Sequence, residues 1–464
     1  MQERRFSMKN LLKTDCESIK NQIKKTVKQP DLYLFLFLVG VFAFAFSTVK
    51  LEPLSDDGSY RTIIDEHPGF LNYLSFTYRF LNGRVIANTL MYVMLQLDCM
   101  PLWVLISTAA VVSIAYHLAR AIGVRPSWKT MSLTLALISC IGIRVLSSSM
   151  LWFTGAIFYL WPIAVTVYLL SRLSERYHNG IPLTFGWRAG LELILSIFVA
   201  LWGEQFALLL IGFWICYLAS LAFQKKKKPS WTEILLISAL VAGFCAMFFA
   251  PSQALKMTNI YGYAAYRGGV GYLLANGLCW SFQSVFIHQK IFVILFGVLI
   301  LLCIDRSKNR VCVRVFEAML GMSILFALMK VLPFAWCNVL TNSLYQIVYL
   351  PDVKYAISAW IPYLFWTAYT TLMLTLFLMH TRKKCFTGLI LLASVATLVI
   401  MWFSTTMYAS GNRTCALFCM GMVALMLKFL IEHEKNYIYA ILGTGICNIL
   451  FLIVPLLQQF VIYY

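Results

Sequence analysis

The chain has 464 residues, of which 61% are hydrophobic and only 12% are charged, and its formal net charge is +19. Its mean hydropathy of +0.77 excludes a water-soluble globular protein. Aromatic residues do not interleave with the basic runs, so nucleic-acid binding is not expected either.

A polar, basic segment at residues 1–31 opens the chain, and residues 32–464 are expected to form one membrane domain. The apolar stretch Leu32 to Val49 is followed by no small-residue cleavage site. We therefore predict a membrane span here rather than a removable signal peptide.

Apolar stretches recur from residue 32 to the C-terminus, and each is long enough to cross about 30 Å of hydrocarbon as a helix. Backbone groups must be satisfied internally in lipid, which predicts an all-α fold, a polytopic integral membrane helical bundle with about 13 transmembrane helices. The predicted spans are 32–50, 101–121, 130–147, 155–173, 187–203, 205–223, 231–250, 290–304, 313–332, 359–380, 386–406, 414–431 and 437–457.

Basic residues gather in short segments between alternate predicted spans. If the N-terminus is cytoplasmic, the predicted count puts all of these segments on the cytoplasmic side, as the positive-inside rule requires. They are residues 4–28, 225–228, 306–314 and 382–384.

The predicted outer segments are longer and more varied in composition. The long ones are 51–100, 251–289 and 333–358, which are rich in Trp, Tyr, Asn, Ser and Gln. Within the first, Val85 to Leu97 predicts an amphipathic helix along the membrane interface. We therefore expect the functional residues at the outer face.

Two adjacent carboxylates, Asp56 and Asp57, follow the first predicted span. Such a pair near a membrane surface is costly unless it meets a cation, a metal ion or a substrate hydroxyl. Either aspartate could act as general base on a sugar hydroxyl. The alternative is a solvated turn, since Asp and Gly favour turns.

Asn82-Gly83-Arg84 ends the same outer segment. The guanidinium of Arg84 could hold a phosphate through two parallel hydrogen bonds. The alternatives are an anchor at the interface or a partner for one of the aspartates.

Aromatic residues cluster from Trp152 through Tyr159 to Trp161. Aromatics at a membrane interface commonly form a belt. Here they could instead form a platform against which a sugar or an isoprenoid chain stacks.

Glu204 and Gln205 stand between two predicted spans at the outer membrane edge, where an acid is costly. Glu204 could pair with Arg84 or Arg413, join the two aspartates at a metal ion, or hold a sugar hydroxyl. A purely structural ion pair is the alternative.

Three cations on the outer side break the positive-inside trend: Lys256, Arg267 and Arg413. One anionic ligand, such as a lipid phosphate, would explain them together. Each alone could be a snorkelling anchor.

Metal-ligand spacings of Cys and His are absent from the sequence, and His67 is the one histidine we expect well outside. If a cofactor is needed, we expect a divalent cation such as Mg or Mn, held by Asp56, Asp57 and Glu204.

The order of these motifs resembles that of the GtrII-like glucosyltransferases of bacteria, which belong to the GT-C class of polytopic membrane glycosyltransferases. The resemblance covers most of the chain. The matching residues are Asp56-Asp57, Tyr60, Asn82-Gly83-Arg84, Thr154-Gly155, Tyr159-Leu160-Trp161-Pro162, Glu204-Gln205, Ala250-Pro251-Ser252 and Arg413. This chain has Pro251-Ser252-Gln253 where such proteins often carry Pro-Gly-Asn, which puts a role for that loop in doubt.

The resemblance implies a bacterial plasma membrane, a polyprenyl-phosphate-sugar donor and an envelope glycan as acceptor. Asp56 or Asp57 would deprotonate the acceptor hydroxyl, and Arg84 and Arg413 would hold the lipid phosphate. Trp152 and Tyr159 would shape the lipid or sugar groove. Glu204 would orient the acceptor or help to hold a divalent ion.

Two other functions remain open. A transporter or flippase for lipid-linked glycans should carry its charges near the bilayer midplane, whereas the conspicuous acids here are expected at one edge. A noncatalytic assembly protein of the envelope should tolerate replacement of both aspartates.

Overall fold

A computed structural model describes residues 30–462, apart from 181–182, 224–227, 259–268, 308, 330–340, 348–356, 405–406, 408–409 and 435–436. Every regular element in these residues is a helix, which confirms the predicted all-α fold. Several sequence predictions lie outside the described residues: the segment 1–29, residues 225–227, Arg267 and most of the predicted outer loop 333–358.

The first half of the described chain forms the helices α2 (Pro30–Ser47), α3 (Asp56–Glu66), α4 (Phe70–Phe76), η1 (Thr77–Leu81), α5 (Val85–Leu97), α6 (Met100–Ala121), α7 (Trp128–Ser139), α8 (Ile143–Ser149), α9 (Phe153–Gly155), η2 (Ala156–Leu160), α10 (Trp161–Asn179), α11 (Trp187–Ala200) and α12 (Glu204–Phe223). The second half forms α13 (Trp231–Phe248), α14 (Pro251–Thr258), α16 (Gly269–Phe282), η3 (Gln283–Ile287), α17 (Lys290–Cys303), α18 (Arg310–Met329), η4 (Ile357–Trp360), α21 (Ile361–His380), α22 (Lys384–Trp402), η5 (Gly411–Cys415), α23 (Ala416–Glu432) and α24 (Ile438–Ile462).

Ten helices of the described chain are long and apolar enough to cross a membrane. The successive helices α7 and α8 are bent by 101° and would add an eleventh span if counted together. A multi-pass helical membrane protein is therefore confirmed. Helices α11 and α17, both of which coincide with predicted spans, have only 14 residues each.

The segment 251–289 differs from the sequence prediction of an outer loop. It contains α14 and a continuous helix of 19 residues, Gly269–Ile287, that is apolar enough to span a membrane. Glycine, asparagine and serine interrupt its apolar residues, so it is the least apolar of the ten candidate spans. That composition explains why the sequence analysis assigned it to a loop.

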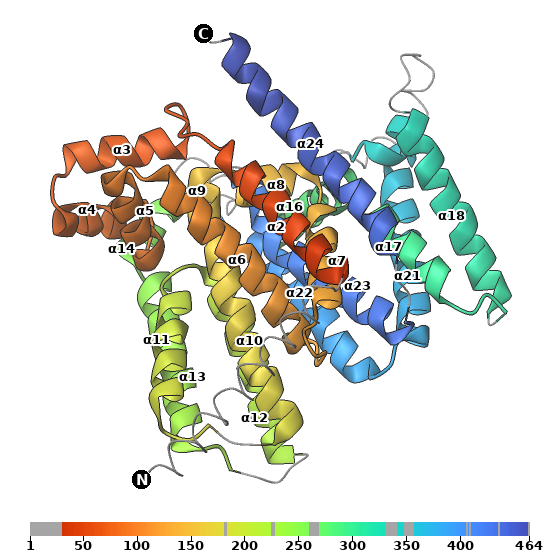
Figure 1. Ribbon diagram of the computed structural model, residues 1–464, viewed down its shortest axis with the longest axis horizontal. Helices are drawn as coiled ribbons and strands as arrows, with labels where there is room; N and C mark the ends of the chain where they lie inside the picture. Colours follow the sequence, from red (N-terminus) through yellow and green to blue (C-terminus); the bar gives the residue numbers. More distant parts are fainter. Residues whose placement is uncertain are drawn as a thin grey trace, which may run out of the picture.

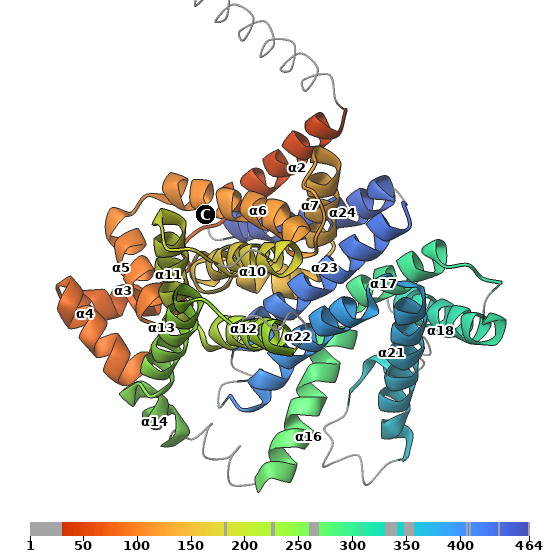
Figure 2. The same cartoon turned by 90° about the horizontal axis from the view of Figure 1, so that it is seen from below.

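Two long helices form the centre of the bundle (Figure 2). In Phe153–Asn179, which contains α10, 83% of the apolar window is buried, and in Gly411–Glu432, which contains α23, 89% is buried. The corresponding share in the other eight candidate spans is 22–44%. Those eight helices surround the two central ones and expose apolar faces of the kind that suits lipid.

The segment between α2 and α6 lies across one end of the bundle. Helices α3, α4 and α5 gather there beside α14 (Figure 1), and α14 contacts η1. The predicted amphipathic stretch is the helix α5, which buries Ala87, Met91 and Met94 and exposes Val93 and Leu97. We call this end, which also holds the start of α12 and η5, the site end.

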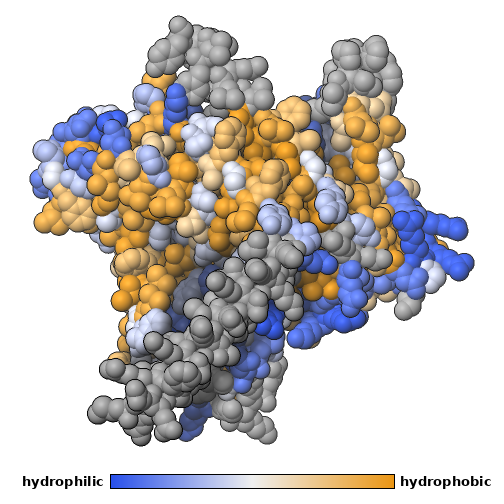
Figure 3. Space-filling model, in the orientation of Figure 1, coloured by the Kyte–Doolittle hydropathy of each residue, from blue (hydrophilic) through white to orange (hydrophobic). Residues whose placement is uncertain are grey.

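The described basic residues Arg306 and Arg310, between α17 and α18, and residues 382–384, between α21 and α22, lie away from α3 and α4 (Figures 1 and 2), and we call this end the basic end. Figure 3 shows a broad hydrophobic band between hydrophilic residues over α3 and α4 and hydrophilic residues at the lower right. Helices α7 and α13 begin with serine capping boxes, at Ser127 and Ser230, which satisfy their first backbone N–H groups.

Candidate functional site

The N-terminus of α3 buries one of its two adjacent aspartates. Asp57 is 2% exposed, and its carboxylate accepts hydrogen bonds from the Glu52 N–H (3.2 Å), the Trp152 Nε1–H (3.1 Å), the Thr154 N–H (3.1 Å) and the Thr154 hydroxyl. Burial raises the pKa of Asp57, although the hydrogen bonds from Thr154 act in the opposite direction. Asp57 thus fastens α3 to α9, and its oxygens are occupied by protein donors.

The neighbouring Asp56 is accessible instead. Its side chain is 46% exposed, and its Oδ2 lies 2.7 Å from Nη1 of Arg413 in η5. The Arg413 guanidinium lies 5.2 Å from the centre of the Trp152 ring, which is a cation–π contact. Its Nε is buried and has no hydrogen-bond partner in the part of the chain that the structure describes. This pair therefore offers an open carboxylate beside an unsatisfied guanidinium donor.

A second ion pair joins Arg84, the residue before α5, to Glu204 at the start of α12. Nη2 and Nε of Arg84 lie 2.9 and 3.1 Å from Oε2 of Glu204, and the amide of Gln253 donates to Oε1 of Glu204 at 3.0 Å. Burial alone would lower the pKa of Arg84, but the adjacent Glu204 carboxylate raises it overall. Gln253 is thus part of the site, although the sequence analysis put its loop in doubt.

Gly83 allows this arrangement. A Cβ atom at this position would stand 2.4 Å from the carbonyl oxygen of Met247 and 2.7 Å from the Cβ of Ala250. Only glycine lets the backbone before Arg84 approach the end of α13 so closely. The turn into α14, which carries Gln253, therefore lies directly beside Arg84.

Lys256 adds a second cation to this pair. It is half-buried on α14, and it forms no ion pair with any other described residue. Burial and the nearby charge of Arg84 lower the pKa of Lys256 to about 8, against an opposing effect of Glu204. Its charge can therefore change close to neutral pH.

Tyr60 lies close to both ion pairs. Its hydroxyl is 3.2 Å from the Asn82 amide nitrogen, and its ring centre is 5.7 Å from that of Phe158. Burial raises the pKa of Tyr60, while the charges of Arg84 and Arg413 lower it and that of Asp56 raises it. Asn82 hydrogen-bonds both the Tyr60 hydroxyl and the Arg84 N–H, so it connects α3 to the Arg84 ion pair.

Arg144, His288 and Asn412 form a chain beside η5 that the sequence analysis missed. Nη1 of Arg144 lies 2.9 Å from Nε2 of His288, and Nδ1 of His288 lies 2.5 Å from Oδ1 of Asn412. Burial and the Arg144 charge lower the pKa of His288. A signal existed in the sequence, because Arg144 falls inside the predicted span 130–147, where a charge is costly.

The bend between α7 and α8 brings Arg144 to this place. A Cβ at Gly142 would stand 2.5 Å from the His288 carbonyl oxygen, and the Gly142 N–H donates to Oε1 of Gln289 at 2.6 Å. Glycine at the bend therefore permits the close approach of the segment that carries His288.

The remaining predicted residues serve mainly as supports. Asn82 accepts hydrogen bonds from the Arg84 N–H and the Asn88 amide, both at 3.1 Å. The amide of Gln205 donates to the carbonyl oxygens of Thr397 (3.1 Å) and Thr414 (3.3 Å) and so ties α12 to α22 and η5. Tyr159 is buried on η2, and its phenol lies near enough to Arg84 to affect that group's pKa.

The predicted metal ligands do not form one donor set. No three His, Cys, Asp or Glu side chains among the described residues are arranged to hold a metal ion. Asp57 is bonded to α9, Asp56 to Arg413 and Glu204 to Arg84. The three acids therefore do not fit a shared divalent ion in this arrangement.

Comparisons of the chain with models of protein families, with curated proteins and with solved structures found no match. The resemblance to GtrII-like glucosyltransferases thus stays a prediction from the motifs and their order.

Proposed function

We propose that the protein is a membrane glycosyltransferase of the GT-C class, which moves a sugar from a polyprenyl-phosphate donor to an envelope glycan. The observation that carries this proposal is the grouping of cations and acids at the site end of the bundle. Arg84, Lys256 and Arg413 lie there with the acids Asp56 and Glu204. The cations can bind a lipid phosphate, and an acid can accept the proton of a sugar hydroxyl.

The geometry favours Asp56 over Asp57 as the general base. The Asp56 carboxylate is accessible and pairs with Arg413, whereas the Asp57 carboxylate is buried and accepts four hydrogen bonds from the protein. In the proposed step, the acceptor hydroxyl gives its proton to Asp56 and its oxygen attacks the anomeric carbon. The bond from that carbon to the phosphate oxygen breaks, and the departing phosphate keeps the electron pair.

Cations would stabilise the departing phosphate. Arg413 has an unsatisfied Nε, and Lys256 forms no ion pair with a described residue, so both can donate to a ligand. Arg84 is held in place by Glu204 and lies 6.0 Å from the Phe158 ring centre. Oriented donors aimed at developing charge are an effective source of rate acceleration.

The proposal also includes the orientation and the finer fold. The basic end would face the cytoplasm by the positive-inside rule, with the site end outside a bacterial plasma membrane and the N-terminus cytoplasmic. Together with the ten candidate spans, the 14-residue helices α11 and α17 and the helix α24 would bring the count to 13, and the bent pair α7 and α8 would bring it to 14.

The test compares the envelope glycan and the lipid-linked donor in cells with wild type, a deletion, Asp56→Asn and Asp57→Asn at matched expression. We expect Asp56→Asn to lose one sugar substituent and to accumulate donor while the protein stays folded. Loss of a general base typically costs about 10²–10⁴-fold in rate. Asp57→Asn should act through instability, visible as lower thermal stability of the purified protein.

A normal glycan in both Asp variants, with an altered glycan in the deletion, would contradict the proposal. A transporter of lipid-linked glycans or an assembly protein would then be the better reading. The transporter is distinguished by the side of the membrane on which the lipid-linked sugar accumulates in the deletion.

A further inference from the structure

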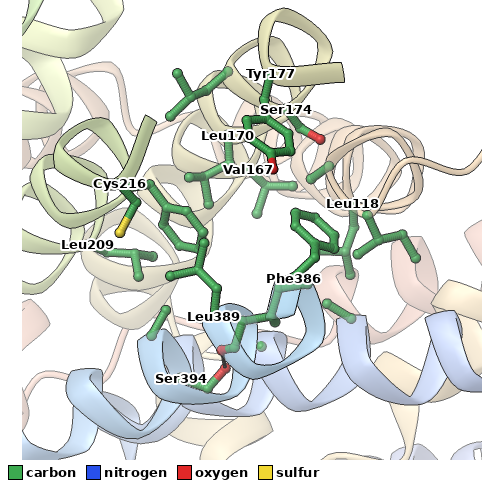
Figure 4. A pocket seen from close by; sticks show the side chains of 18 of the residues that line it. Leu118, Val167, Leu170, Ser174, Tyr177, Leu209, Cys216, Phe386, Leu389 and Ser394 are labelled. Carbon is green, nitrogen blue, oxygen red and sulfur yellow. Dashed lines mark hydrogen bonds between the residues drawn. The ribbon is translucent and has the colours of Figure 1, made fainter. Parts of the chain in front are cut away.

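An apolar cavity of about 370 Å³ lies among the helices of the bundle. Five helices line it: α6, α10, α12, α22 and α23. Figure 4 shows Leu170, Ser174 and Tyr177 of α10 across the cavity from Leu389 and Ser394 of α22. Its volume falls within the roughly 300–1,000 Å³ that is typical of ligand pockets.

The cavity extends from the basic end toward the middle of the bundle. Its lining residues on α22 run from Cys385, the second residue of that helix, to Thr397. That interval of 12 residues corresponds to about 18 Å along a helix. One leaflet contributes about 15 Å, half of the hydrocarbon core. The cavity therefore has the depth of a single leaflet.

Basic residues border the end of the cavity. Lys383 and Lys384 directly precede Cys385 and Phe386, and both lysines are exposed without an ion pair to any described residue. The acid Glu432, near this end, is already paired with Lys428. An apolar cleft with unpaired cations at its mouth matches a lipid with an anionic headgroup.

We propose that this cavity binds an acyl chain of an anionic phospholipid from the leaflet at the basic end, with Lys383 and Lys384 contacting the lipid phosphate. None of the charged residues of the candidate functional site lines the cavity, although Thr397 at its inner end accepts a hydrogen bond from Gln205, and the proposal does not depend on the proposed reaction. A bound lipid would fill the space between α12 and α22 and so hold the two helices that Gln205 connects near the site end.

The test measures lipid retention by the purified full-length protein in native mass spectrometry, with phosphatidylglycerol and phosphatidylcholine of identical chains. Wild type should retain phosphatidylglycerol about 25-fold better, since each of the two lysines near the headgroup contributes roughly fivefold. Ala393→Phe fills the cavity and should reduce retention of both lipids. Ala396→Phe is the matched control, because Ala396 lies on the same helix, is exposed and does not line the cavity.

The charge contribution is tested separately. Lys383→Asn with Lys384→Gln should abolish the preference for phosphatidylglycerol and leave phosphatidylcholine retention unchanged. Asn is chosen because Lys383 has φ +51°, a region that Asn tolerates. Arg306→Gln with Arg310→Gln removes the same charge elsewhere at the basic end and should keep the preference.

Equal retention of the two lipids by wild type would overturn the proposal, and that measurement requires no variant to fold. The proposal would also be overturned if Ala393→Phe eluted as a monodisperse folded protein and retained as much lipid as Ala396→Phe. Displacement of phosphatidylglycerol by undecaprenyl phosphate at equal concentration would assign the cavity to a polyprenyl chain instead.

Discussion

Asp56 and Asp57 are neighbours in the chain but occupy different environments. A helix turns by about 100° per residue, so consecutive side chains at the start of α3 point in different directions. The Asp57 side chain faces Trp152 and Thr154, and the Asp56 side chain faces Arg413. The same acidic pair thus provides a structural carboxylate and an accessible one.

Lys256 gives a prediction for pH dependence. Its pKa of about 8 means that its charge is lost as the pH rises through 8, and binding of undecaprenyl phosphate should weaken there by about tenfold. Lys256→Arg should remain charged and show no such decline, because arginine is protonated up to about pH 12. A binding titration from pH 6.5 to 9.5 checks this, and an identical decline in both proteins would count against the role of Lys256.

The same shift affects stability with a defined sign. The pKa of Lys256 is lower in the folded protein than its ordinary value of 10.5, so between about pH 8 and 10.5 the unfolded chain binds more protons. This residue should therefore make the folded state more stable as the pH rises through that window. Thermal melts of wild type and Lys256→Met in the same buffers check this. The difference in melting temperature between the two proteins should shrink toward pH 10.5.

At the level of elements, short helices are placed by single polar contacts. Helix α3 has 11 residues and buries Asp57, Tyr60 and Ile64. Isolated helices of this length are marginal in water, so the contacts of Asp57 with α9 are needed to hold α3 across the bundle. The hydrogen bond from Gly142 to Gln289 likewise holds α8 in place at the bend after α7, and so sets the direction of Arg144.

Thr154→Val tests the attachment of α3. It removes the hydroxyl that donates to the buried Asp57 carboxylate and should lower the free energy of unfolding by about 1–3 kcal/mol. Thr62→Val is the control, since Thr62 is exposed on α3 and bonds only to the Gly58 carbonyl within its own helix. Equal melting temperatures for the two variants in detergent would show that Asp57 does not secure the helix.

At the level of the whole molecule, the two ends differ in chemistry. The site end has long segments with acids and aromatic residues, and the basic end has short loops with few acids. Helices α18 and α21 lie at the edge of the molecule far from α3 and α4 in both views (Figures 1 and 2).

Orientation is predicted from this difference. In a background without other cysteines, Leu54→Cys, at a fully exposed position of the site end, should react with an impermeant maleimide in intact cells. Arg306→Cys, at the basic end, should react only after permeabilisation. The reverse labelling pattern would place the candidate functional site in the cytoplasm and remove the support for an envelope glycan as acceptor.

The sequence by itself determined the membrane class and most long helices, because the length and hydropathy of a span are local properties of the chain. The sequence analysis missed the helix Gly269–Ile287, because its glycines and polar residues are typical of a loop. Its burial depends on contacts with other helices: a Cβ atom at Gly277, for example, would meet the Trp402 side chain. Motif order also suggested the candidate residues Asp56, Arg84, Glu204 and Arg413.

Only the tertiary structure decided which of these residues meet. Arg84 and Glu204 are 120 residues apart and Asp56 and Arg413 are 357 apart, so their pairing depends on how distant helices pack. The sequence analysis left open whether Glu204 pairs with Arg84 or Arg413, and it had no means to rank Asp56 against Asp57. Burial and hydrogen bonding separate the two aspartates, and both are properties of the folded chain rather than of a motif.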